Sequence, residues 1–257
     1  MPRQERKKLS DFNVTKVEIE DAFKKLFSDC LQHNEQIKDL NVIFKIAITN
    51  LSLFPNFNLP TGSTYKDYID RWIHGYSEAL KNIPSEKEAS PKLSCSDPAI
   101  KTIVQNVTKA SNAEAEQQNS HHNLFMSAEN IQGNLLEEYI NKNIRPLDWY
   151  WCAGNVLRAV DFCSPKGPVL LQIKNKSNTE NSSSGAIRIG TDIKKWYRLG
   201  TKTQNRVKIP DYKWEKLNEI INQTVSKKGL KASMNEEDYQ NFLATVAKKN
   251  SKIITDK

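Results

Sequence analysis

The sequence predicts an α/β (α+β) fold in which helices flank a mixed β-sheet and a helical region comes first. Apolar residues recur at helical spacing through the first third of the chain. Short aliphatic and aromatic segments lie between residues 147 and 176, and further helical spacing closes the chain. We therefore expect a helical N-terminal region at residues 1–123 and a core with C-terminal helices at residues 124–257.

Helical periodicity defines the elements of the N-terminal region. The segments with this spacing are residues 19–30, 37–51 and 65–80. A fourth helix is expected through Val107, because Asp97 before Pro98 is a capping residue followed by proline at the first helical position.

Residues 111–123 are polar and lack apolar periodicity, so we expect a linker or an exposed loop there. A further helix is expected to begin at Ser127, its N-cap, and to carry three glutamates. These are Glu129, Glu137 and Glu138.

Three short segments rich in aliphatic and aromatic residues predict a β-meander. They are residues 147–152, 156–163 and 168–176, separated by Ala-Gly-Asn and by Ser-Pro-Lys-Gly. Two C-terminal helices are expected at residues 214–225 and 239–246, the second capped by Ser233 or Asn235.

Composition narrows the class of protein. The longest apolar runs fall well short of the roughly 20 residues that span a bilayer. The basic N-terminus has no apolar segment behind it, so we expect a cytoplasmic protein. Four cysteines without a CxxC pair give no zinc signature, and the pair His121-His122 stands in a polar stretch.

The positive charge is concentrated in one part of the chain. The net charge is +8, and residues 164–216 contain twelve basic and four acidic residues, an excess equal to that of the whole chain. A local basic block is typical of a phosphate-binding surface. The alternative is a solvated basic face without a nucleic-acid partner.

The third predicted strand carries the candidate chemistry. Side chains alternate along a strand, so Gln172 and Lys174 share one face of VLLQIKNK. The preceding segment ends near Asp161, and a short turn joins the two. Antiparallel pairing of that length brings Asp161 beside Gln172 and Lys174.

Phosphodiester hydrolysis requires such a set of groups. A hard cation binds oxygen ligands, which Asp161, the main-chain carbonyl of Ile173 and a second carboxylate can supply. A lysine beside them can orient the attacking water or offset charge on the phosphate. The pattern D-x10-Q-x-K alone is weak, and an ordinary strand with a lysine that extends to solvent also satisfies it.

A longer stretch resembles a known family. The succession AENIQGNLLEEYI, DWYWCAG, LRAVDFC, VLLQIKNKSNTENSSSGAIRIGT and KWYRL is similar to the type II restriction endonucleases of the SinI group. It covers roughly residues 126–220. The resemblance implies a PD-(D/E)XK fold and Mg²⁺-dependent double-strand cleavage. It also implies a companion DNA methyltransferase and a short palindromic target of the GGWCC kind.

Carried over by position, Asp161 matches the aspartate of the family motif and Lys174 its lysine. Gln172 stands where the motif has Asp or Glu, which removes one charge from the metal site. The resemblance implies that a helix glutamate meets this deficit. Glu137, four residues after Gly133, fits the pattern G-x-x-x-E, while Glu138 is a rival and Glu129 a more distant one.

DNA recognition is expected in the polar stretch 176–198, interpreted as a flexible loop. An arginine can make two hydrogen bonds to guanine, a role that Arg188 could fill. The other candidate DNA-binding residues are Lys176, Asn178, Lys194, Lys195 and Arg198, with the last three expected at phosphates. The alternative is a solvated Ser/Asn loop.

Three functions remain open on the sequence. They are a restriction endonuclease, a repair or junction nuclease of the same fold, and a non-catalytic nucleic-acid-binding protein. A palindromic target presents the same half-site twice, so the first function predicts a homodimer on double-stranded DNA.

Overall fold

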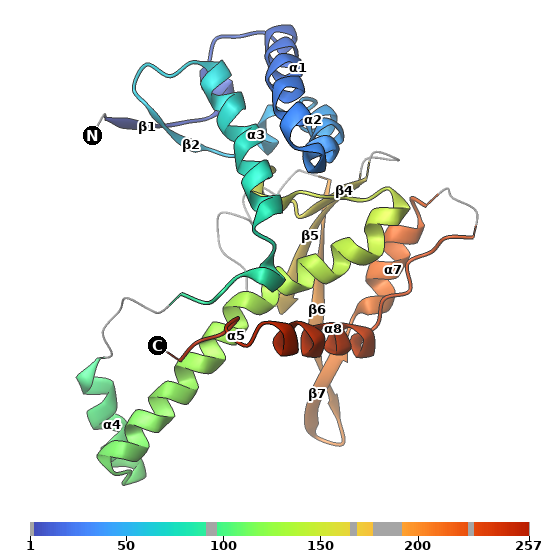
Figure 1. Cartoon of the computed structure of the whole chain (residues 1–257). Helices are drawn as coiled ribbons and strands as arrows, with labels where there is room; N and C mark the ends of the chain where they lie inside the picture. Colours follow the sequence, from blue (N-terminus) through green and yellow to red (C-terminus); the bar gives the residue numbers. More distant parts are fainter. Residues whose placement is uncertain (1–2, 91–96, 165–168, 177–191, 226–228, 257) are drawn as a thin grey trace. The chain divides into compact units, whose positions relative to one another are not determined.

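A computed structural model describes residues 3–90, 97–164, 169–176, 192–225 and 229–256 (Figure 1). The chain forms two compact units. The first unit consists of residues 1–82 and 139–236, and the second of residues 83–138 and 237–257. The sequence-based boundary at residues 123 and 124 falls inside helix α5 (Asn112–Ile144), which contributes to both units.

The predicted N-terminal helices are present in the first unit as α1 (Lys16–His33), α2 (Leu40–Ala47) and α3 (Tyr65–Lys81). Capping boxes at Thr15 and Thr64 begin α1 and α3, because each threonine accepts the N–H of the residue three positions on. Rings from the three helices pack together, with Phe23 stacked on Phe44 at 3.8 Å and Trp72 against both.

A small sheet accompanies these helices. Strands β1 (Gln4–Lys7) and β2 (Phe57–Pro60) pair antiparallel, with Glu5 opposite Leu59. Short 3-10 segments complete the connections along the chain. They are Leu9–Asp11, Glu35–Asp39, Leu51–Leu53, Pro84–Glu86, Arg145–Leu147 and Ala153–Asn155.

The main sheet of the first unit has the strand order β3-β4-β5-β6-β7. Its strands are β3 (Tyr150–Trp151), β4 (Phe162–Ser164), β5 (Val169–Lys176), β6 (Ile193–Gln204) and β7 (Val207–Tyr212). Only β5 and β6 pair parallel, and the other neighbours are antiparallel. The sheet is therefore mixed, as the sequence predicts, and its first three strands form the expected meander.

The second strand of the meander is much shorter than predicted. Residues 156–161 are not part of a strand, and the strand begins only at Phe162. Gly154, Asn155 and Ala159 have positive φ angles of 69°, 58° and 60°, which turn the chain instead. Gly154 also lies against α3, where an added Cβ would meet that of Ala79 at 2.6 Å.

The loop interpretation of residues 176–198 is wrong for its described C-terminal part. Residues 193–198 belong to β6, with Ile193, Trp196 and Arg198 buried. The hairpin from β6 to β7 turns at Asn205-Arg206, both with positive φ, as two-residue hairpin loops require.

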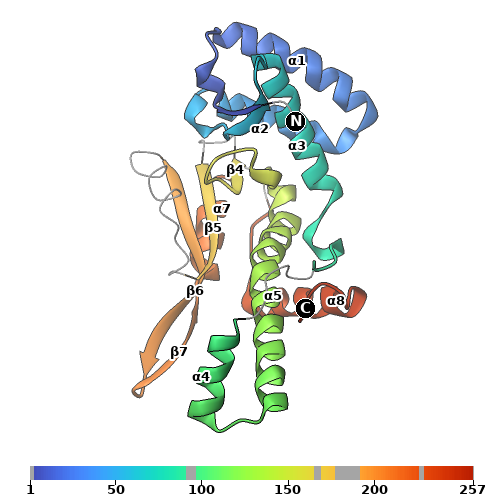
Figure 2. The same ribbon diagram turned by 90° about the vertical axis from the view of Figure 1, so that its left-hand side faces the viewer.

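Helices α4 (Pro98–Thr108), α5 and α8 (Glu236–Lys249) supply the second unit (Figure 2). The linker expected at residues 111–123 is wrong, because α5 begins at Asn112. At this end of α5 the carboxylate of Glu114 accepts the N–H of Ser111, and the hydroxyl of Ser111 accepts the N–H of Glu114. Ser127 is not an N-cap but lies within α5, where its hydroxyl accepts the N–H of Thr255 at 3.1 Å.

The C-terminal helices are close to those predicted. Helix α7 (Trp214–Asn222) belongs to the first unit and packs Trp214 against Trp196 of β6 at 5.3 Å. Helix α8 belongs almost entirely to the second unit, where Val246 packs with Leu135 of α5 and with Ile253. Among the described residues, none of the helices has the length and apolar character needed to span a membrane.

Candidate active site on strand β5

Strand β5 lies in the middle of the main sheet and carries the predicted site. Antiparallel pairing sets Phe162 of β4 opposite Leu171, so Asp161 follows opposite Gln172. On the other edge of β5, parallel pairing sets Gln172 beside Lys195 and Lys174 beside Tyr197. The side chains of Gln172, Lys174, Lys195 and Tyr197 therefore project from one face of the sheet.

Backbone hydrogen bonds fix the position of Asp161. Its N–H donates to the carbonyl of Leu171 at 2.9 Å, and its own carbonyl accepts the N–H of Cys152 at 2.8 Å. Its Oδ2 accepts the N–H of Ile173 at 2.6 Å, so the carboxylate takes the place of a strand partner just before β4 begins. The predicted pairing thus brings Asp161 to the edge of β5.

Burial raises the pKa of Asp161 to about 6, because desolvation disfavours the charged form. The N–H of Ile173 and the positive charge of Lys174 lower this pKa, but by less than burial raises it. Near neutral pH the group is a carboxylate whose charge the described protein compensates only in part. Such a group is suited to bind a cation.

The two other motif residues differ in exposure. Lys174 is half-exposed and interacts electrostatically with Asp161. Gln172 is buried and has polar interactions of its own. The structure thus brings Asp161, the main chain of Ile173 and Lys174 together, and it places Gln172 in the interior.

The parallel neighbour β6 adds Tyr197, which the sequence pattern did not single out. Tyr197 stands beside Lys174, and the ammonium group of Lys195 lies over its ring, 4.6 Å from the ring centre. Both residues are half-exposed. Only the pairing of β5 with β6 reveals this proximity, since the two strands are separated in the chain by residues 177–192.

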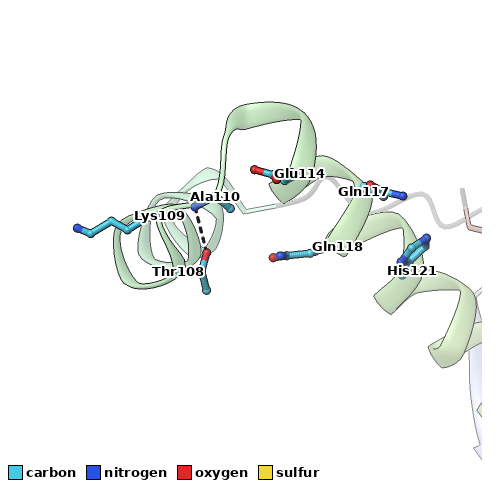
Figure 3. Close-up of a pocket in the computed structure, with 7 residues that line it drawn as sticks. All are labelled: Thr108, Lys109, Ala110, Glu114, Gln117, Gln118 and His121. Atoms are coloured by element: carbon cyan, nitrogen blue, oxygen red, sulfur yellow. Dashed lines mark hydrogen bonds between the residues drawn. The ribbon is translucent and has the colours of Figure 1, made fainter.

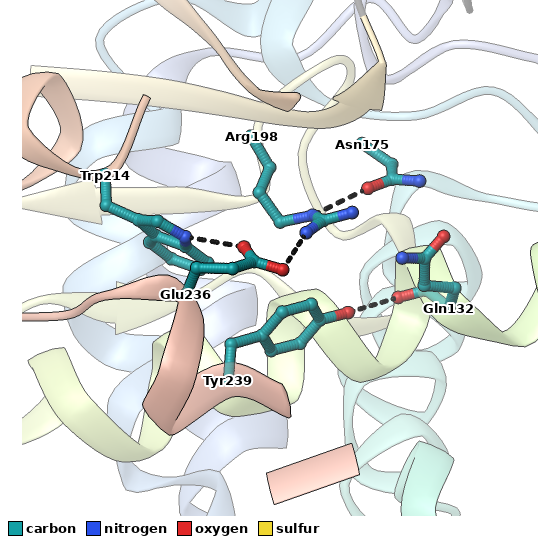
Figure 4. A network of polar contacts seen from close by, with 6 residues as sticks. All are labelled: Gln132, Asn175, Arg198, Trp214, Glu236 and Tyr239. Carbon is teal, nitrogen blue, oxygen red and sulfur yellow. Dashed lines mark hydrogen bonds and ion pairs between the residues drawn. The ribbon is translucent and has the colours of Figure 1, made fainter. Parts of the chain in front are cut away.

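The opposite face of the sheet holds a buried polar network (Figure 4). Arg198 is buried and donates from Nε to Asn175 at 2.9 Å and from a terminal nitrogen to Glu236 at 2.6 Å. Trp214 donates its ring N–H to the second oxygen of Glu236 at 2.8 Å. Arg198 was expected at a phosphate, but in the structure its guanidinium has partners within the first unit.

The candidate glutamates of α5 lie in the second unit. Glu138 is buried, and its two oxygens accept the N–H of Ser85 at 2.8 Å and the hydroxyl of Ser85 at 2.7 Å. Glu137 is half-exposed and Glu129 exposed. Glu138 therefore fixes the chain at Ser85. Figure 4 also shows another contact of this unit, from the hydroxyl of Tyr239 to the carbonyl of Gln132 at 3.4 Å.

The oxygens around Asp161 suit a hard cation. Oδ1 of Asp161 has no hydrogen-bond partner among the described residues, while Oδ2 is held by Ile173. The N–H and C=O of a strand residue point to the same edge, so the Ile173 carbonyl lies on the Asp161 side of β5. The described chain has no cluster of three or more His, Cys, Asp or Glu side chains placed to hold a metal.

The remaining candidate DNA-binding residues fall into two groups. Lys176 and Lys195 are half-exposed and Lys194 is exposed, so all three have access to solvent. Asn178 and Arg188 lie outside the described residues.

Comparison with known proteins identifies the family. The family model described as SinI restriction endonuclease matches residues 63–245, which include all of the main sheet. The chain belongs to the SinI restriction endonuclease family. The predicted class of enzyme, a type II site-specific deoxyribonuclease, is thereby confirmed.

Two relatives of this family show how far the likeness extends. The type II restriction enzyme Eco47I of Escherichia coli is 32% identical over 214 residues, covering 80% of this chain and 86% of that enzyme. The type II restriction enzyme SinI of Salmonella infantis is 39% identical over 132 residues, covering 50% of this chain and 51% of that enzyme.

Proposed function

We propose that this restriction endonuclease has a PD-(D/E)XK active site and makes Mg²⁺-dependent double-strand cuts at a short palindromic site of the GGWCC kind. The observation that carries the active-site assignment is the carboxylate of Asp161, which accepts the N–H of Ile173 at 2.6 Å and interacts electrostatically with Lys174. Family membership supports the type of reaction.

In this proposal Asp161 and the carbonyl of Ile173 hold the metal ion. When bound, Mg²⁺ supplies a Lewis acid that polarises the phosphate and lowers the pKa of a coordinated water. The raised pKa of Asp161 supports this assignment, because a nearby cation offsets the cost of the buried charge.

Lys174 acts on the attacking water or on the phosphate. Its ammonium group projects from the half-exposed face of β5, one residue beyond the main chain that holds Asp161. A fixed cation there favours the negative charge that develops in the transition state. Gln172 is buried on the same strand, so we assign it a supporting role in the polar interior rather than direct metal binding.

Glu137 is our candidate for the second carboxylate. Its neighbour Glu138 already accepts two hydrogen bonds from Ser85, which commits that side chain to the structure of the second unit. Glu137 is half-exposed and remains the better choice under the pattern G-x-x-x-E.

DNA binding is proposed on the face of β5 and β6 that carries Lys174 and Lys195, with Lys176 at the end of β5. Lys194 precedes Lys195 and projects from the other face, so we propose for its exposed side chain only a phosphate contact at the start of β6. Arg188 and Asn178 are proposed to contact bases. Arg198 is assigned a structural role, because its guanidinium is buried against Glu236. We propose a cytoplasmic homodimer on double-stranded DNA, protected from cutting its own genome by a methyltransferase of the same specificity.

The test is digestion of plasmid DNA with Mg²⁺, followed by sequencing of the fragment ends. Discrete fragments with one shared recognition sequence support the proposal. Nicking or cleavage limited to branched DNA would instead indicate a repair or junction nuclease, and intact DNA would indicate a binding protein. Asp161→Ala should bind the duplex without cutting it, and Asp29→Ala, an exposed aspartate of α1, should cut as the wild type does.

A further inference from the structure

Helix α4 carries an apolar surface that the second unit leaves uncovered. Ile100, Ile103 and Val107 are 61%, 64% and 76% exposed, at the spacing that aligns side chains along one face of a helix. Leu124 and Phe125 are also exposed, so residues 100–125 contain five of the nine exposed large apolar side chains among the described residues. We call Ile100, Ile103 and Val107 the α4 stripe.

Little of the α4 stripe is covered within the described chain. Helix α4 has 11 residues, none of them buried, and isolated helices below about 12–15 residues are marginal in water. Asp97 caps its first turn by accepting the N–H of Ala99, and Lys101 pairs with Glu116 of α5 at 2.7 Å. Neither contact involves the α4 stripe, whose side chains are mostly exposed within the described part of the chain.

The turn between α4 and α5 is polar, in contrast to the stripe. Seven residues line a hollow there, among them Lys109, Glu114 and His121 (Figure 3). Lys109 ends α4 with a φ of 60°. Helix α4 thus has an acidic residue, Asp97, at its first end and a basic residue, Lys109, at its last.

Charge decides which partner suits this surface. Residues 97–125 contain two basic and three acidic residues, whereas the chain as a whole has a net charge of +8. Two copies of a basic protein repel each other least where the local charge is small. A DNA partner would instead select the basic face of β5 and β6, because phosphates attract lysine and arginine.

We propose that the α4 stripe packs antiparallel against the α4 stripe of a second copy of this chain, about a two-fold axis near Ile103. In that arrangement Ile100 of one copy meets Val107 of the other, and the first end of each α4, with Asp97, lies beside the last end of the other, with Lys109. Parallel packing would bring like charges together instead. The antiparallel arrangement is isologous, as a two-fold dimer requires.

The inference rests on the proposed function, which requires two identical subunits on a palindromic site, and it adds the surface that joins them. One pair of short helices buries less than the roughly 1,200–2,000 Å² of a stable interface. We therefore expect a dimer that dissociates on dilution and that a duplex containing the target site strengthens.

The experiment is sedimentation of the full-length protein over a concentration series, without DNA and with a target duplex. Ile103→Asp should weaken dimerisation at least tenfold, because it places two carboxylates in the apolar contact. Val17→Asp is the matched control, since Val17 is 64% exposed on α1 and should not alter dimerisation. Circular dichroism checks that both variants fold.

A charge pair tests the direction of packing. Lys109→Asp should weaken the dimer several-fold, because the new carboxylate would lie near Asp97 of the other copy and repel it. Aspartate tolerates the left-handed conformation at this position. Adding Asp97→Asn, which keeps the helix cap, should restore part of the loss. If the double variant dimerises more weakly than Lys109→Asp alone, antiparallel packing is wrong.

Plasmid digestion separates this inference from the proposed function. A wild-type protein that cuts specifically but sediments as a monomer with and without target DNA overturns the α4 interface and leaves the function intact. The same holds if Ile103→Asp dimerises as the wild type does. A wild-type protein that dimerises through Ile103 but cuts no duplex upholds the interface and overturns the function.

Discussion

Replacing Asp161 by asparagine should make the metal-free protein more stable above pH 6, although it removes a residue of the proposed active site. Burial raises the pKa of Asp161 from 3.8 to about 6 in the folded protein. One pKa unit corresponds to about 1.36 kcal/mol, so the buried charge costs about 3 kcal/mol of folding free energy. Asparagine carries no charge and its side-chain oxygen can still accept the N–H of Ile173.

The effect has a defined pH dependence. Between about pH 4 and pH 6 the folded protein binds the proton of Asp161 more tightly than the unfolded chain does. The free energy of unfolding contributed by this group therefore falls as pH rises through that window, and it stays lower above the window. The stabilising effect of Asp161→Asn should be absent near pH 4 and fully developed near pH 8.

Urea unfolding with a chelator present, at pH 4 and pH 8, measures this difference. Allowing for the new amide hydrogens, which lack an acceptor, we expect Asp161→Asn to gain roughly 1–3 kcal/mol at pH 8. Asp29→Asn, at an exposed aspartate, should change nothing. With Mg²⁺ the wild type should gain stability and the variant should not. A variant that is less stable than the wild type at pH 8, or equally shifted at both pH values, would refute the argument.

Three further predictions concern cleavage, the α5 glutamates and DNA binding. Lys174→Ala should slow single-turnover cleavage by several orders of magnitude, by analogy with the roughly 3–4 kcal/mol lost when a transition-state donor is removed. A loss of tenfold or less would indicate a surface lysine. Glu137→Gln should abolish cleavage, whereas Glu138→Gln should mainly lower the free energy of unfolding by roughly 1–3 kcal/mol, and the reverse result would exchange their roles. In a binding titration, Tyr197→Ala should weaken DNA binding about two- to fivefold, because the ammonium group of Lys195 loses its contact with the ring. Tyr197→Phe keeps the ring and should bind as the wild type does. Equal losses in both variants would point to the hydroxyl instead.

Local patterns in the sequence predicted the central part of the fold. The apolar spacing at residues 19–30, 37–51 and 65–80 predicted α1, α2 and α3, because such spacing reflects how a single helix presents one face to the core. The pairing of β4 with β5 was also predictable, since a short connection permits only an antiparallel neighbour. That pairing is what places Asp161 beside Ile173.

Elements that depend on distant partners were not predictable in this way. The parallel pairing of β5 with β6 brings Tyr197 beside Lys174, and no local pattern encodes a parallel neighbour. The first turns of α5 are polar, and Glu116 there pairs with Lys101 of α4, so this part of the helix lacks the apolar spacing by which a helix is predicted. Near β4, the positive φ of Ala159 interrupts a segment whose composition favours a strand.

The basic excess of residues 164–216 does not all serve DNA binding, because the alternation of strand side chains divides it between two faces. Lys174 and Lys195 project from the half-exposed face that we assign to the phosphate. Arg198 projects from the other, where Glu236 neutralises its charge and Asn175 accepts a hydrogen bond. Asn175 follows Lys174 in the chain, so the residue next to Lys174 is held on the other face of the sheet by the buried Arg198–Glu236 pair. A buried ion pair gives little net stability, but it restricts the chain to one arrangement. The position of Lys174, our proposed catalytic lysine, thus depends on an arginine that net charge alone would have assigned to DNA.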